Sequence, residues 1–297
     1  MKKFLLILTT LFIVGAIGYL FFYPYDYLVT IEAKANAGTI NQTIKLWDST
    51  LDSTKLTSDL DLRHLDQSLS FNDSTHIYSW EISEENDSVS KIKIFAKDSQ
   101  NSLMNKILVP FTDTDFEKRT VRTLSDFNEN LHNHLKRIRV KVVGEEIIDS
   151  AYYAYVTVKS SQFDKAKGMM RNFPLLDPYL VNNGAKLKGR PFIEIVKWDK
   201  KKDSIEYHFG YPVIKSDSLP QHPDLQYGFR KKSKALKAIY NGNYITSDRA
   251  WYALLDYAKK HNIDVTGLPI EIFYNNPNLG GDELNWKAEV YMPLSKQ

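Results

Sequence analysis

The chain has 297 residues, of which 43% are hydrophobic, 25% charged and 13% aromatic. This composition is that of a globular protein, and the length suggests two domains, since one domain usually holds roughly 100–200 residues. Cysteine is absent, which excludes disulfides, thiolate zinc sites and cysteine nucleophiles. The net charge of +3 is too small to indicate a nucleic-acid partner.

An uncharged run at the N-terminus, residues 4–22, follows Lys2 and Lys3. A helix of about 20 apolar residues spans a bilayer core of roughly 30 Å. The two lysines are expected to stay in the cytoplasm, which places the rest of the chain outside, in the periplasm of a Gram-negative cell. The alternative is a cleaved signal peptide, whose apolar part usually runs ~7–15 residues and ends at a small-x-small site. Because this run is longer and no such triplet follows closely, we expect residues 1–25 to be a retained transmembrane anchor.

Charge divides the rest of the chain into two parts. Residues 26–146 carry a net charge of −5, whereas residues 147–297 carry +6. Opposite charge fits two modules of different character, although charge of this size mostly serves solubility. We therefore expect two folded domains with these bounds.

The first of these domains has the pattern of a mixed α+β fold. Tyr27–Ala33 is expected to be a strand and Thr39–Leu46 a short helix, and Ser74–Ile82 and Val89–Ala96 predict two paired strands. A long helix is expected to begin near Thr114, because apolar residues then recur at spacings of three and four. Such a stripe indicates a helix that covers a sheet.

This order of elements is similar to the helix-grip fold of the SRPBCC superfamily, which includes START-like and polyketide-cyclase-like proteins. The resemblance spans residues 27–143 and includes the neighbourhood of Trp47 and Asp48. It implies that a cupped sheet and the long helix enclose an apolar cavity.

Two segments of the second domain echo each other. The sequence Gly-Arg-Pro-Phe-Ile-Glu-Ile at 189–195 returns as Gly-Leu-Pro-Ile-Glu-Ile at 267–272. Each is followed by a polar turn and an aromatic-rich strand that ends at proline, and each is preceded by a strand and a helix. This predicts a duplicated strand–helix–strand–strand unit whose two sheets face a shared cleft. The preceding strands and helices are expected at Tyr152–Lys159 and Gln162–Arg171 in the first copy, and at Ala235–Tyr240 and Asp248–His261 in the second.

Four short segments carry a resemblance to a known family. They are 241–244, 251–255, 271–277 and 289–294. With them, residues 148–297 resemble the GyrI-like effector-binding domain, which is the sensor module of AraC-type and MerR-type transcription regulators. The expected fold is thus α+β: a transmembrane helix, a helix-grip domain and a duplicated β-α-β-β effector-binding domain.

The resemblance implies that Glu271 points into an aromatic cleft. A carboxylate desolvated among rings is costly alone, and a bound cation relieves that cost. Rings within about 6 Å of the cation add attraction of roughly 0.5–2 kcal/mol each. By pseudo-symmetry, Glu194 is expected to be a second acid in the cleft. The expected ligand-binding residues are Glu271, Glu194, Tyr153, Tyr244, Trp251 and Phe273.

The same residues also fit an ordinary fold. The Ile-Glu-Ile pattern is typical of a half-exposed strand whose acid faces water. Tyr153, Tyr244 and Trp251 would pack equally well in a core, since aromatic residues dominate cores. Both interpretations stay open on the sequence alone.

The resulting functional expectation is a membrane-anchored, non-catalytic protein that binds a small lipophilic or cationic molecule. No cofactor, metal or nucleic-acid partner is expected, and the sequence has no nucleophile elbow, metalloprotease, P-loop or dinucleotide motif. The alternatives are a small hydrolase or cyclase that uses Glu271 as a general acid or base, and an envelope protein that holds a lipid or a partner protein. The substitution Glu271→Gln is expected to weaken cation binding while the melting temperature holds or rises.

Overall fold

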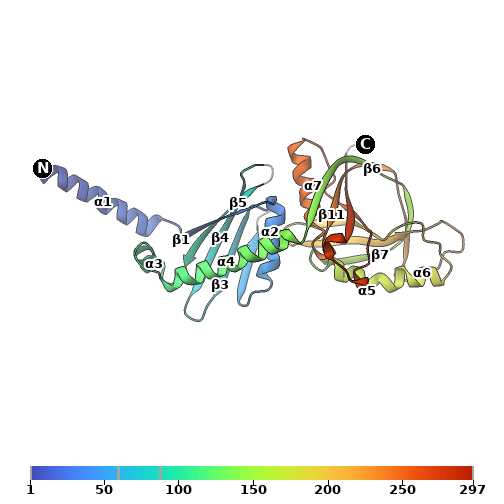
Figure 1. Ribbon diagram of the computed structural model, residues 1–297, viewed down its shortest axis with the longest axis horizontal. Coiled ribbons are helices and arrows are strands. Elements are labelled where there is room, and N and C mark those ends of the chain that lie inside the picture. The colour runs from blue at the N-terminus through green and yellow to red at the C-terminus, as the bar shows by residue number, and fades with distance from the viewer. Residues whose placement is uncertain (1, 59–60, 87–88, 296–297) are drawn as a thin grey trace. The chain divides into compact units, whose positions relative to one another are not determined.

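A computed structural model describes residues 2–58, 61–86 and 89–295, so Met1 of the predicted anchor and the last two residues of the second predicted domain lie outside it. The chain forms two compact units, one up to Asn133 and one from His134 onward (Figure 1). This boundary, between residues 133 and 134, lies N-terminal to the boundary expected between residues 146 and 147. The reason is that β6 (Arg139–Ile148) pairs along its length with β11 (Ser233–Asn241), a strand of the second unit.

The chain begins with α1 (Lys2–Phe22). Within the described residues it is the one helix whose length and mean hydropathy of 2.4 suit a membrane span, and a signal sequence would have the same properties. None of its residues is buried. At its C-terminal end, the ring of Tyr23 lies 5.5 Å from that of Tyr19 and 4.5 Å from that of Tyr25. Aromatic residues of this kind are enriched where membrane helices leave the bilayer.

The first unit is built on a five-stranded antiparallel sheet in the order β1-β5-β4-β3-β2. The strand predicted at Tyr27–Ala33 has those bounds, and the two strands predicted next correspond to β4 and β5. The sequence patterns do not indicate β2 and β3, because both strands are rich in Ser, Thr and charged residues and Gln67 takes a buried position in β3. The strands are β1 (Tyr27–Ala33), β2 (Thr54–Ser58), β3 (His64–Ser70), β4 (Thr75–Glu84) and β5 (Ser90–Asp98).

Helices α2 (Ala37–Asp48) and α4 (Asp115–Lys136) cover one face of this sheet, and the short α3 (Ser102–Leu108) precedes α4. The expected start of the long helix is confirmed, since the Thr114 hydroxyl accepts a hydrogen bond from the Glu117 amide, 3.1 Å away. This contact satisfies one of the amides that every helix start leaves open.

Aromatic rings fill the space between α4 and the sheet. The Phe127 ring lies 5.3 Å from Trp47 and 4.9 Å from Trp80, and the two indoles are 6.2 Å apart. A groove of about 370 Å³ remains at the edge, between β1 and the Val121–Asn128 stretch of α4. Around these three rings, side chains therefore fill the space between α4 and the sheet.

The second unit has an eight-stranded antiparallel sheet in the order β10-β7-β9-β8-β12-β13-β11-β6. Its helices α5 (Lys165–Leu176), α6 (Pro178–Asn182) and α7 (Arg249–Lys260) contribute to the main hydrophobic cluster on one face. A smaller cluster on the other face contains residues of strands alone, among those described. The remaining strands are β7 (Ala151–Ser161), β8 (Phe192–Asp199), β9 (Ser204–Pro212), β10 (Gln226–Arg230), β12 (Ile270–Phe273) and β13 (Lys287–Pro293).

The expectation of two separate sheets is wrong. β8 and β12, the strands that carry the two echoing segments, pair with each other and join both halves into one sheet. Ile193 lies opposite Glu271 at the centre of this pairing. β8 and β12 are therefore both paired on their two edges, β8 with β9 and β12, and β12 with β8 and β13.

Candidate functional site

Glu271 lies on the face of the sheet that the helices cover. Its neighbour Phe273 belongs to the main hydrophobic cluster, whereas Ile270 belongs to the cluster on the opposite face. Successive side chains of a strand point to opposite faces, so Glu271 shares the face of Phe273. The exposed fraction of Glu271 is 0%.

The carboxylate of Glu271 is paired inside the protein. The ammonium of Lys165, which is also 0% exposed, lies 2.8 Å from Oε1. The Ser247 hydroxyl donates to Oε2 at 2.7 Å, and the Trp251 indole N–H donates to Oε1. The expectation of an acid free to meet a ligand therefore has to be corrected, because a residue of this chain already supplies the positive charge.

Lys165 is held as firmly as its partner. Its ammonium also donates to the Ser247 hydroxyl at 2.6 Å and lies 4.6 Å from the centre of the Trp251 ring. The Tyr207 hydroxyl donates to its backbone carbonyl at 2.9 Å. Lys165 is the first residue of α5, so this ion pair fixes the start of that helix against β12.

A second buried polar network borders α7 in the same unit. The Gln162 amide donates to Asp248 at 2.5 Å and to the Tyr252 hydroxyl at 3.0 Å, and it accepts from the Trp198 indole at 2.9 Å. Asp248 also pairs with Arg249, 2.9 Å away. Burial raises the pKa of Tyr252, so its hydroxyl stays protonated and able to donate.

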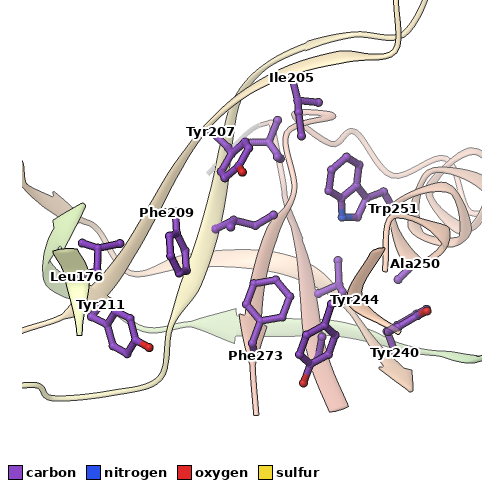
Figure 2. Close-up of a cluster of buried hydrophobic side chains, with 14 of the residues drawn as sticks. Leu176, Ile205, Tyr207, Phe209, Tyr211, Tyr240, Tyr244, Ala250, Trp251 and Phe273 are labelled. Atoms are coloured by element: carbon purple, nitrogen blue, oxygen red, sulfur yellow. The ribbon is translucent and has the colours of Figure 1, made fainter. Parts of the chain in front are cut away.

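A cavity of about 1010 Å³ lies beside the ion pair, on the same face of the sheet. Figure 2 shows Phe209 and Tyr211 of β9, with Phe273 of β12 and Tyr244, among the aromatic side chains of this interior. The wall is rich in rings and sulfur, which suits a lipophilic occupant. The aromatic and methionine residues that line it are Phe163, Met169, Met170, Phe173, Phe209, Tyr211, Tyr244, Phe273, Tyr274 and Trp286.

The expected site residues divide into three groups. Tyr244 and Phe273 line the cavity. Glu271 and Trp251 do not line it and form the buried network described above. Glu194 and Tyr153 lie elsewhere, as the register of the sheet explains.

Glu194 lies on the face opposite Glu271. In the paired register, Glu194 faces Ile270, and Ile193 faces Glu271. Aligning the Gly-x-Pro triplets of the two echoing segments likewise matches Ile193, not Glu194, with Glu271. One residue of offset moves a side chain to the other face. Tyr153 lies with Glu194 there, donating to it from 3.3 Å, so neither residue lines the cavity.

The polar groups of the cavity wall are mostly engaged within the protein. The Tyr244 hydroxyl donates to the Lys287 carbonyl at 2.8 Å and accepts from the Asn275 amide, and burial raises its pKa. The Tyr211 hydroxyl donates to Asp177 at 3.3 Å. These phenols therefore present ring faces to the cavity while their hydroxyl groups stay satisfied.

Five charged side chains line the cavity. Asp164 accepts from the Ser161 hydroxyl at 2.7 Å, and Arg190 donates to the Tyr274 carbonyl at 3.1 Å. Lys167 and Arg171, one turn apart on α5, neither hydrogen-bond nor ion-pair with another described side chain. Asp177 is engaged by Tyr211. Among the residues that the structure describes, Lys167 and Arg171 are therefore the cations of this wall without a hydrogen-bond or ion-pair partner.

The sequence matches no protein family and no curated protein. Several solved structures are similar to the chain. The C-terminal domain of EcmrR is 14% identical over 54% of this chain and 99% of its own, with a TM-score of 0.45. EcmrR in a complex with DNA is 12% identical, with coverages of 72% and 88% and a TM-score of 0.42. SAV2435 bound to tetraphenylphosphonium is 10% identical, with coverages of 52% and 94% and a TM-score of 0.37. These similarities do not define the ligand of this chain.

Proposed function

We propose that the second unit is a binding domain for small lipophilic molecules and that the cavity beside Glu271 holds them. The observation that carries this is the cavity itself, about 1010 Å³ in volume and lined by eight aromatic residues and two methionines. Ligand pockets in proteins commonly measure roughly 300–1,000 Å³ and are mostly apolar. A packed core of this size would hold no such space.

The order of elements supports a GyrI-like effector-binding domain made of two related halves. Each half runs strand, helix, strand, strand: β7, α5, β8 and β9 in the first, β11, α7, β12 and β13 in the second. In the sheet, the trio β7-β9-β8 and the trio β12-β13-β11 are in mirror order and meet where β8 pairs with β12. We propose that this arrangement reflects an internal duplication, and that the first unit is a helix-grip domain with its interior filled.

The charges predict which ligands are favoured. A cation that approached Glu271 would have to displace Lys165 from a fully buried pair. Lys167 and Arg171, in contrast, line the cavity with no hydrogen-bond or ion-pair partner among the described residues. We therefore propose a neutral or anionic lipophile. The cationic ligand suggested by the sequence remains an outcome of the test below.

The test uses two ions of nearly the same shape and opposite charge, tetraphenylborate and tetraphenylphosphonium, titrated calorimetrically into the full chain in a mild detergent. We expect tetraphenylborate to bind and to bind more tightly. The variant Met170→Asp places a charge on the cavity wall at a residue that is 58% exposed, and it should weaken binding at least severalfold. Val181→Asp is the matched control, since Val181 is 50% exposed on α6 and does not line the cavity.

The outcomes test separately whether the cavity binds lipophilic molecules and whether it prefers anions to cations. If neither ion binds, or if both variants behave like the original chain, the cavity is not a binding site for lipophiles. If tetraphenylphosphonium binds more tightly, the site exists and the proposed charge preference is wrong. The double variant Lys167→Glu/Arg171→Glu should invert the preference, whereas Lys201→Glu/Lys202→Glu changes the net charge equally at residues away from the cavity.

We further propose that α1 is retained as a membrane anchor with the two units outside the cytoplasm. The length and apolar character of α1, and the tyrosines at its end, support this arrangement. The protein would then present a ligand-binding domain at the outer face of the membrane.

A further inference from the structure

We infer that α3 and the residues directly after it lie in the surface layer of the bilayer beside α1, so that the first unit rests on the membrane. The inference depends on the proposed anchoring through α1. The surface concerned consists of the exposed apolar side chains of α3 and of Phe111 after it. We call it the α3 surface, and its residues are Leu103, Met104, Ile107, Leu108 and Phe111.

The α3 surface is apolar and exposed. The exposed fractions are 46% for Leu103, 57% for Met104, 43% for Ile107, 38% for Leu108 and 84% for Phe111. Leu103, Met104, Ile107 and Leu108 recur at spacings of three to four residues, so they share one side of α3, and Phe111 follows three residues after the helix ends. Soluble proteins seldom leave so many neighbouring large apolar side chains in water.

The opposite side of α3 is polar and buried, which inverts the usual pattern of a surface helix. Asn105 is 6% exposed and Lys106 is 4% exposed. The Asn105 amide lies 3.3 Å from Asp98, and the Ser102 hydroxyl donates to Asp26 at 2.5 Å. The polar residues thus attach α3 to the folded unit, and the apolar residues are left to face outward.

Lys106 connects α3 directly to the end of α1. Its ammonium donates to the carbonyls of Leu20 at 3.3 Å and Tyr23 at 2.5 Å. The last carbonyls of a helix lack partners within it, so this lysine caps the C-terminal end of α1. Tyr19, near the end of α1, and Tyr23 and Tyr25, directly after it, are expected at the boundary between hydrocarbon and water. A helix fixed to this end of α1 lies at the same level.

These observations favour a lipid surface as the occupant. α3 is in contact with α1, whose own side chains are apolar and exposed. A helix with one apolar side buries that side in the acyl boundary of a bilayer. A second copy of the chain could also cover the α3 surface, and the experiment distinguishes the two.

The absence of cysteine in the chain allows single-cysteine variants to be labelled with an environment-sensitive fluorophore. Met104→Cys and Phe111→Cys report on the α3 surface and Ile13→Cys on α1. Lys55→Cys is the control, on β2 at the edge of the sheet farthest from β1. The full-length variants are reconstituted in phosphatidylcholine vesicles with and without a lipid that carries a quencher near its headgroup.

We expect labels at 104 and 111 to be blue-shifted and quenched severalfold more than the label at 55, with the label at 13 also buried in lipid. If the label at 13 is in lipid while those at 104 and 111 behave like the control, the anchor stands and the inference about α3 is overturned. If the labels at 104 and 111 are shielded from water but not quenched by lipid, a protein contact covers the surface and the inference is also overturned. If the label at 13 is in water, the anchor proposal itself fails.

Discussion

The two units place helices over an antiparallel sheet, and their interiors differ. In the first unit, Trp47, Trp80 and Phe127 meet between helix and sheet with ring centres 4.9 to 6.2 Å apart. In the second, the rings line a cavity of about 1010 Å³, and a buried ion pair stands beside it. The second unit thus has a packed hydrophobic cluster of its own, but a cavity opens beside it on the face of the sheet that carries the helices.

The difference shows what keeps a cavity open. A packed interior is stabilised by the apolar area it buries. The second unit buries apolar area too, and α5 is in addition joined to β12 through Lys165 and Glu271 beside the cavity. The hydroxyl groups of Tyr211 and Tyr244 are likewise held by Asp177 and the Lys287 carbonyl, so their rings cannot easily fold into the space.

Breaking the ion pair should give an effect as large as any predicted for this chain. Lys165→Met leaves Glu271 buried without a counter-charge, and removing one partner of such a pair typically costs about 3–5 kcal/mol. Glu271→Gln should also lower the melting temperature, which reverses the expectation from the sequence that it would hold or rise. Thermal unfolding followed by tryptophan fluorescence measures both variants.

The control for this prediction is the double variant Lys165→Met/Glu271→Gln. It leaves neither charge unpaired, so it should be more stable than Lys165→Met alone. Equal melting temperatures for the single variants and the original chain would show that the pair does not hold α5 in place, and the comparison between the two interiors would lose its explanation.

A second prediction concerns the filled interior. Trp80 is 1% exposed, and Trp80→Ala should cost about 3–5 kcal/mol, because a removed core ring leaves a cavity that the surroundings only partly close. Met170→Ala, on the wall of the existing cavity, should cost less than about 1 kcal/mol, since Met170 is already 58% exposed. Urea titrations of the two variants compare these costs, and similar losses would contradict the distinction between a filled and a hollow interior.

The sequence predicts the elements of both units better than it predicts the site. The strand at Tyr27–Ala33, the start of the long helix and the order of elements in the second unit follow from local patterns. The joining of β8 and β12 does not, because strand pairing across the two echoing segments leaves no local signal. The face of Glu194 could have been predicted, since the Gly-x-Pro alignment matches Glu271 with Ile193.

Lys165, the buried partner of Glu271, is the residue of the candidate site that sequence reasoning misses. It lies 106 positions from Glu271, and a lysine at the start of a predicted helix is normally expected in water. The one local hint is that Lys165 is followed by Lys167 and Arg171, whose spacing places those two on one side of α5 and leaves Lys165 apart. Only the three-dimensional arrangement shows that this chain neutralises its own buried acid.

The smallest effect is expected on the face of the second sheet opposite the helices. There Glu289 accepts hydrogen bonds from Lys287 at 2.8 Å and Tyr291 at 2.9 Å and pairs with Lys237 at 3.2 Å. Burial alone would raise the pKa of Glu289, but these donors outweigh it and lower the pKa to about 2. A carboxyl whose pKa is lower in the folded than in the unfolded chain stabilises the fold above the unfolded value, and that contribution disappears as the pH falls toward 2. Glu289→Gln should therefore lower the melting temperature by a few degrees at pH 7, with a difference from the original chain that shrinks between pH 5 and pH 2. A difference that stays constant over this range would mean that shape, and not charge, is what Glu289 contributes.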